Sequence, residues 1–134
     1  MSCLFHSLGQ LLELPSDQTR QLICDYLLAG GPIIDGMTTA EVLELECSDV
    51  NRTDNINYTE YYINRMRMSS TWGGAIEIQA AVNLWNVRVI VENRRDWLNP
   101  RLLEFVPLST SHETTLLIYW TGCHYEPVSS RVST

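Results

Sequence analysis

The chain has 134 residues, of which 45% are hydrophobic and 19% are charged, as in an ordinary globular protein. This length allows a hydrophobic core and predicts a single domain over residues 1–134. The formal net charge of −7 argues against nucleic acids and anionic membrane surfaces as partners, because both are negatively charged. No apolar run approaches the roughly 18 residues of a membrane-spanning helix, and we expect no signal peptide at the start of the chain.

Two helices are predicted at the start of the chain. Apolar residues repeat with helical spacing over Leu4–Leu12 and predict an amphipathic helix. This helix should end near Glu13, because Pro15 disfavours helix at the residue before it. Ser16 is expected to N-cap a second helix, which the run Gly30–Pro32 ends.

Three further helices are expected before residue 86. Thr38–Glu41 has the pattern of a capping box and opens a short acidic helix. Thr59–Met68 and Ala75–Trp85 follow, and the last of these is apolar enough to be mostly buried. Its polar residues Glu77 and Gln79 therefore need hydrogen-bonding partners.

From Val87 the spacing of apolar residues changes to that of β-strands. Strands are expected over 87–92, 102–108, 114–120 and 124–128, and the nearly continuous apolar run 114–120 is expected at the centre of the sheet. Helices first and strands last predict an α+β fold, with N-terminal helices packed on a mostly antiparallel C-terminal sheet.

Three residues that are distant in the sequence supply the groups of a cysteine hydrolase. Cys3 lies at a helix start, where backbone N–H groups and the helix dipole favour the thiolate. His124 opens the last strand, and Glu126 lies two residues further on the same face, where it can orient the imidazole. Nucleophile, base and orienting carboxylate are thus available. The alternative to a catalytic role is that Cys3 is only a small apolar residue at a helix start and that Glu126 is only a solvated carboxylate at a strand end. His6 and His112 are expected at the surface.

Four segments carry a resemblance to a known family. Cys3–Leu8 resembles the cysteine-helix motif of the ovarian-tumour (OTU) family of deubiquitinating cysteine proteases. Thr71–Ala80 resembles that family's Trp-Gly-Gly motif and the helix after it, and Asn86–Val91 resembles its next strand. His124–Val128 resembles its terminal histidine motif. Order and spacing agree over nearly the whole chain, and the length resembles that of compact members, several of which are viral.

The resemblance implies a papain-like OTU cysteine protease fold and a deubiquitinating isopeptidase. Such an enzyme cleaves after the C-terminal Gly-Gly of ubiquitin through a thioester intermediate. By position, Cys3 would be the nucleophile and His124 the general base. The partners would be ubiquitin or polyubiquitin conjugates, or another ubiquitin-like modifier, and no metal or organic cofactor is implied. The expected location is the cytoplasm, which is the host cytoplasm for a viral protein.

The same resemblance suggests residues that bind the substrate. Gly73 and Gly74 permit close backbone approach, as a narrow channel for the glycines of ubiquitin would require. Trp72 is a candidate wall of that channel, and Tyr125 neighbours the histidine. A purely structural role for Trp72, Gly73 and Gly74 is the alternative.

Two positions depart from the family pattern. Glu126 stands where many members have Asp or Asn. Many members also carry Asp-Gly-Asn directly before the cysteine, where this chain has only Met1-Ser2. The Cys3 N–H can be one oxyanion donor, and the second must come from Ser2, Met1 or elsewhere. Two alternatives follow: a weakly active or inactive OTU-like module that binds ubiquitin, and a protease for another ubiquitin-like modifier or a viral polyprotein.

Overall fold

The computed structural model describes residues 3–34, 36–46, 58–94, 98, 101–108, 114–121 and 124–132, with the side chains of all but 3, 44–46, 58 and 129–132. The helices are α1 (Cys3–Leu12), α2 (Ser16–Leu28), α3 (Thr39–Glu46), α4 (Tyr58–Met66) and α5 (Ala75–Trp85). The strands are β1 (Pro32–Ile34), β2 (Met37–Thr38), β3 (Arg88–Asn93), β4 (Arg101–Phe105), β5 (Thr114–Trp120) and β6 (Tyr125–Val132). The bounds of α5 and β5 are those predicted from the sequence.

The main sheet has the strand order β4-β3-β5-β6. β5 lies inside the sheet, as its apolar sequence predicts, and Leu116 and Ile118 on it are buried. β3 pairs antiparallel with β4 but parallel with β5, and β5 pairs antiparallel with β6. The sheet is therefore mostly antiparallel, with one parallel pair. This pair forms because β4 occupies one edge of β3, so that β5 joins the other edge and runs in the same direction as β3. The small antiparallel sheet β1–β2 has no counterpart in the sequence prediction.

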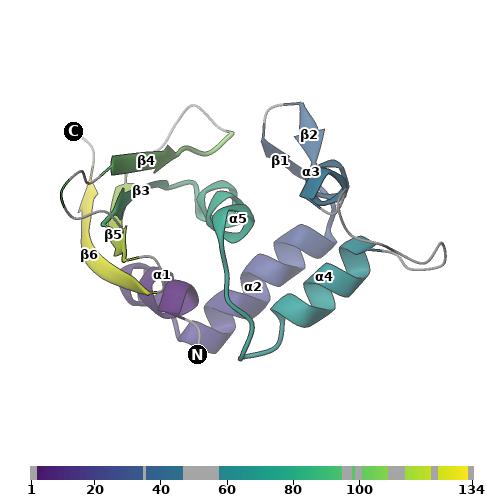
Figure 1. Ribbon diagram of the computed structural model, residues 1–134, viewed down its shortest axis with the longest axis horizontal. Helices are drawn as coiled ribbons and strands as arrows, with labels where there is room; N and C mark the ends of the chain where they lie inside the picture. The colour runs from purple at the N-terminus through teal and green to yellow at the C-terminus, as the bar shows by residue number, and fades with distance from the viewer. Residues whose placement is uncertain are drawn as a thin grey trace.

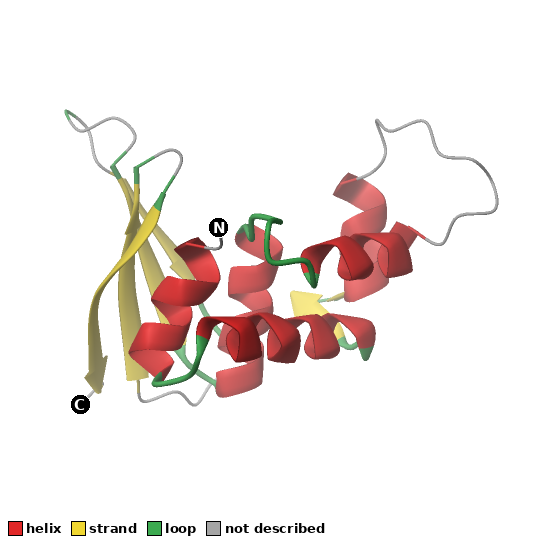
Figure 2. Ribbon diagram, turned by 90° about the horizontal axis from the view of Figure 1, so that it is seen from below, coloured by secondary structure: helices red, strands yellow, loops and turns green. Residues whose placement is uncertain are grey.

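The helices cover one side of the main sheet, as Figure 1 and Figure 2 show. α1 packs against β6 and β5, and α5 packs against β3 and β4. α2 lies in a second layer, in contact with α1, α4 and α5. One buried apolar cluster joins these elements and includes Phe5, Leu8, Ile23, Ile63, Ile78 and Val89. Over the described ranges, no helix is long and apolar enough to cross a membrane.

α1 ends as predicted near Glu13, in a left-handed turn. The Leu14 N–H donates to the Gly9 carbonyl at 2.8 Å, and the Glu13 N–H donates to the Gln10 carbonyl at 3.4 Å. This is the Schellman pattern, which requires one residue with positive φ, and Glu13 has φ 62°. Gly9 is needed beneath this turn, because a Cβ there would lie 2.6 Å from the Leu14 carbonyl oxygen.

The predicted N-cap of the second helix is wrong by one residue. Pro15 is the N-cap of α2, in extended backbone geometry, and Ser16 is the first helical residue. The Pro15 carbonyl accepts both the N–H and the hydroxyl of Thr19, at 2.9 and 2.8 Å. By contrast, the capping box of α3 forms as expected: the Thr38 N–H donates to Glu41 Oε1 at 3.2 Å, and the Glu41 N–H donates to the Thr38 hydroxyl at 3.4 Å.

Candidate active site

A histidine and a carboxylate meet at the start of β6. The Thr121 N–H donates to the His124 carbonyl at 3.0 Å, which joins the ends of β5 and β6. Nε2 of His124 contacts Oε1 of Glu126, and both side chains are partly exposed. His124 directly precedes β6, and Glu126 is the second residue of that strand. Residues two apart in extended backbone share a face, so the contact is local to this segment. Tyr125, between them, stacks on Trp120 with ring centroids 6.2 Å apart, and burial raises the pKa of its hydroxyl.

The helix that carries Cys3 packs against this strand. α1 begins at Cys3 and contacts β6 and β5 along the sheet. Phe5, in its first turn, is fully buried. The side chain of Cys3 and the whole of Ser2 lie outside the described residues, so the structure gives no position for the thiol or for the second oxyanion donor. His112, Cys47 and Cys123 also lie outside them.

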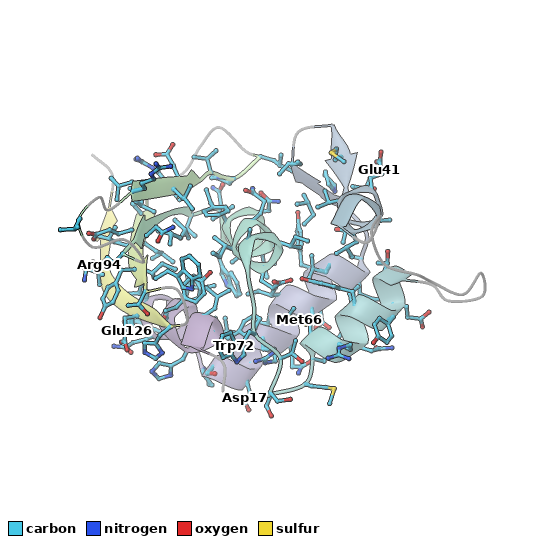
Figure 3. The ribbon with its side chains drawn as sticks, viewed as in Figure 1. Asp17, Glu41, Met66, Trp72, Arg94 and Glu126 are labelled. Atoms are coloured by element: carbon cyan, nitrogen blue, oxygen red, sulfur yellow. The ribbon has the colours of Figure 1, made fainter. Side chains whose placement is uncertain are left out.

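The Trp-Gly-Gly segment lies on the first turn of α1. A Cβ on Gly73 would be 2.8 Å from Cδ2 of Leu4 and 3.0 Å from two carbons of the Phe5 ring. Two segments about 70 residues apart are therefore in direct contact at the helix start, as Figure 2 also shows. In Figure 3, Trp72 and Glu126 lie on opposite sides of α1. The structure thus brings the predicted substrate-binding glycines next to the turn that begins with Cys3.

Glu77 has the partners that its burial requires. It is 1% exposed, and its Oε1 accepts the Gly74 N–H at 2.7 Å. Its Oε2 accepts the Tyr62 hydroxyl at 2.6 Å. Gln79, the second polar residue for which partners were expected, donates to the Val106 carbonyl at 2.9 Å. Both residues therefore have hydrogen-bond partners beyond the body of α5.

Arg20 also belongs to this region, although the sequence analysis does not identify it. Its guanidinium lies 4.3 Å from the centroid of the Phe5 ring and is buried. It donates to the carbonyls of Met66 at 2.6 Å and Ser69 at 3.3 Å. An arginine within a partly polar helix looks like a surface residue, so no sequence pattern distinguishes it.

A cavity of about 460 Å³ opens on the side of the Trp-Gly-Gly segment that faces α4. It is lined by residues 71–77 and by α4 side chains that include Tyr61, Tyr62 and Arg65. Trp72 is 64% exposed at its edge, so its ring is not part of the core. Within the described part of the chain, no cluster of three or more His, Cys, Asp or Glu residues could hold a metal ion.

Comparisons with known proteins identify the fold. The family model for OTU-like cysteine proteases matches residues 2–125. A search of curated proteins finds no match. Among solved structures, an ovarian-tumour domain in complex with ubiquitin is 18% identical, with a TM-score of 0.66, and the match covers 96% of this chain and 63% of that one. The chain therefore spans somewhat less than two thirds of that protein.

Two viral structures are similar as well. The OTU domain protease of Dera Ghazi Khan virus is 18% identical, with a TM-score of 0.63, and 98% of this chain and 75% of that one are covered. The OTU domain protease of Farallon virus is 15% identical, with a TM-score of 0.62, and the match covers 97% of this chain and 78% of that one. At these identities the likeness concerns the fold, and it confirms the predicted OTU fold.

Proposed function

Since this chain belongs to the family of OTU-like cysteine proteases, we propose that it is a deubiquitinating isopeptidase that cleaves after the C-terminal Gly-Gly of ubiquitin. The observation that carries the proposal is the contact between the Glu126 carboxylate and Nε2 of His124, on the strand that packs against the helix beginning with Cys3. One similar solved structure is an OTU domain in complex with ubiquitin. This supports ubiquitin, alone or in chains, as the modifier.

His124 has the main part in activating the thiol. A helix start contributes ~0.3–1 kcal/mol, too little to ionise most of a thiol at neutral pH. Pairing with an imidazolium can lower the pKa of a thiol to ~3–4. With Nε2 on Glu126, Nδ1 is the ring nitrogen that takes the thiol proton. The Glu126 carboxylate then holds the ring plane and stabilises the imidazolium.

The reaction proceeds in two steps. The Cys3 thiolate attacks the terminal carbonyl carbon of ubiquitin, and the oxyanion accepts hydrogen bonds from the N–H of Cys3 and, we propose, of Ser2. The imidazolium protonates the departing lysine amine, leaving a thioester on Cys3. Water, deprotonated by His124, then hydrolyses the thioester and frees ubiquitin. Gly73 and Gly74 border the passage for the ubiquitin tail.

The first experiment uses ubiquitin with a thiol-reactive group in place of its terminal carboxylate, read by intact mass. We expect a one-to-one adduct on the wild type and none on Cys3→Ala. Hydrolysis of a fluorogenic ubiquitin amide should fall by about 10²–10⁴-fold in His124→Ala. The matched control is His6→Ala, because His6 is an exposed residue of α1 and its removal should leave the rate unchanged. A wild-type rate in His124→Ala would refute the assignment of the base.

Glu126 is tested separately. A hydrogen bond to a charged group is worth ~1.5–3 kcal/mol, so Glu126→Ala should lower kcat by about 10–150-fold. Glu92→Ala is the control, since Glu92 also lies on the sheet and pairs with a cation, Arg94.

Two other outcomes of the adduct experiment would favour the alternatives. If the wild type binds ubiquitin but forms no adduct, the binding module is favoured. If it neither forms an adduct nor binds ubiquitin, another ubiquitin-like modifier or a viral polyprotein is favoured as the substrate.

A further inference from the structure

A buried carboxylate ties the Trp-Gly-Gly segment to the helices behind it. Glu77 stands in the first turn of α5 and holds the Gly74 N–H with one oxygen and the Tyr62 hydroxyl with the other. Tyr62 belongs to α4. A buried carboxylate with two such bonds keeps its neighbours in one arrangement, because losing either bond leaves a buried polar group unsatisfied.

Arg20 holds the chain just before the same segment. Its guanidinium donates to the carbonyl of Met66, the last residue of α4, and to the carbonyl of Ser69, which precedes Trp72 by three residues. The same guanidinium lies over the Phe5 ring, and Gly73 packs against Phe5 and Leu4. The first turn of α1 is thus in contact with a segment that is held at Gly74 by Glu77 and preceded by residues that Arg20 holds.

We propose that Glu77 is a positioning residue of the active site. By holding Gly74, it keeps Gly73 against Leu4 and Phe5 and so sets the start of α1, with Cys3, relative to the strand of His124. The effect is indirect, because Glu77 is buried behind the segment and touches no substrate. The inference rests on the proposed function where turnover of ubiquitin is measured, whereas alkylation of Cys3 tests it without ubiquitin.

The alternative is that Glu77 merely caps α5. α3 offers a matched control, because Glu41 has the same capping-box position there and accepts the Thr38 N–H. Glu41 is exposed, and the main contacts of α3 in the described structure are with α4, β1 and β2. Glu77→Ala and Glu41→Ala therefore remove the same kind of cap, one beneath the proposed site and one away from it.

The first readout is kcat and KM for a fluorogenic ubiquitin amide, on variants shown to be folded by urea unfolding. We expect Glu77→Ala to lower kcat by about 10²-fold, the scale of a small misplacement of reacting groups, with little change in KM. Glu77→Gln should restore most of the rate, because its amide oxygen can still accept the Gly74 N–H. Tyr62→Phe should lower kcat by a smaller factor, and Glu41→Ala should keep it. Wild-type kcat in folded Glu77→Ala would overturn the proposal, and if that variant does not fold, wild-type kcat in Tyr62→Phe would do so.

The second readout is the rate at which iodoacetamide alkylates Cys3 across a range of pH, assigned by comparison with Cys3→Ser. A thiol held beside a histidine reacts as a thiolate below neutral pH. Glu77→Ala should move the alkylation profile to higher pH, whereas Glu41→Ala should not. If the wild type does not cleave ubiquitin, the proposed function fails, but a shifted profile still supports positioning by Glu77 and an unshifted profile overturns it.

Discussion

Gly73 offers the most direct test of the contact between the Trp-Gly-Gly segment and α1. In Gly73→Ala, the new Cβ would lie 2.8 Å from Cδ2 of Leu4 and 3.0 Å from Cε2 and Cζ of Phe5. Carbon atoms in contact are normally ~3.5–4.0 Å apart, so the neighbours must move by about 0.5–1 Å. Leu4 and Phe5 are 2% and 0% exposed, and the Arg20 guanidinium covers the Phe5 ring. The strain therefore cannot be relieved toward solvent.

Overpacking of this kind costs ~1–3 kcal/mol of folding free energy. The added methyl group also restricts the unfolded chain, which offsets ~0.4–1 kcal/mol. Gly31→Ala is the matched control, because a Cβ at Gly31 meets no atom within 4 Å and Gly31 is not among the positive-φ glycines. The control variant keeps only the gain in folding stability that comes from restricting the unfolded chain. The free energies of unfolding of the two variants should therefore differ by about 1–3 kcal/mol.

The assay is urea unfolding of both variants and the wild type, followed by tryptophan fluorescence and circular dichroism, with kcat measured on the same preparations. Gly73→Ala should unfold at lower urea than Gly31→Ala and should also lose activity, because the displaced turn carries Cys3. Equal unfolding midpoints for the two variants would mean that the segment does not press on α1. The same result would remove the basis for positioning by Glu77.

Two further predictions concern stability. Glu13→Gly should stabilise the protein by about 0.5–1 kcal/mol, because Glu13 has φ 62° and a left-handed residue with a Cβ is strained; Glu13→Ala, which keeps the Cβ, should show no such gain in urea unfolding. Burial raises the pKa of the Cys24 thiol to about 11 from its ordinary value of 9.0, so the folded protein binds this proton more tightly than the unfolded chain does. The contribution of this thiol to the free energy of unfolding is fully present below pH 9. It is lost as the pH rises from 9 through about 11, by roughly 3 kcal/mol in all. Cys24→Ala should flatten this part of the pH dependence, and an unchanged slope would contradict the assignment.

Local patterns in the sequence determined much of the fold. The apolar spacing over Leu4–Leu12 and Ala75–Trp85 predicts α1 and α5 because helical periodicity needs only neighbours three and four residues apart. The continuous apolar run of β5 likewise predicts its place inside the sheet. The N-cap at Pro15 rather than Ser16 was missed because a cap is expected to be a residue whose side chain accepts a hydrogen bond, and Pro15 caps α2 without one.

The residue types of the candidate site were also readable from the sequence. The contact of Glu126 with His124 joins positions two residues apart at the start of β6, so the geometry of extended backbone alone anticipates it. The OTU motifs supply the candidate nucleophile by their order along the chain. Roles in catalysis for these residues stay predictions, and the side chain of Cys3 lies outside the described structure.

Only the tertiary structure decided which distant segments meet. The sequence contains no pattern that places Gly73 on Phe5, Arg20 over the same ring, or the Tyr62 hydroxyl on Glu77. The parallel pairing of β3 with β5 is likewise decided by β4, which occupies the other edge of β3. Periodicity reports which face of an element is apolar, whereas the partner of that face is selected by how all the elements fill one core together.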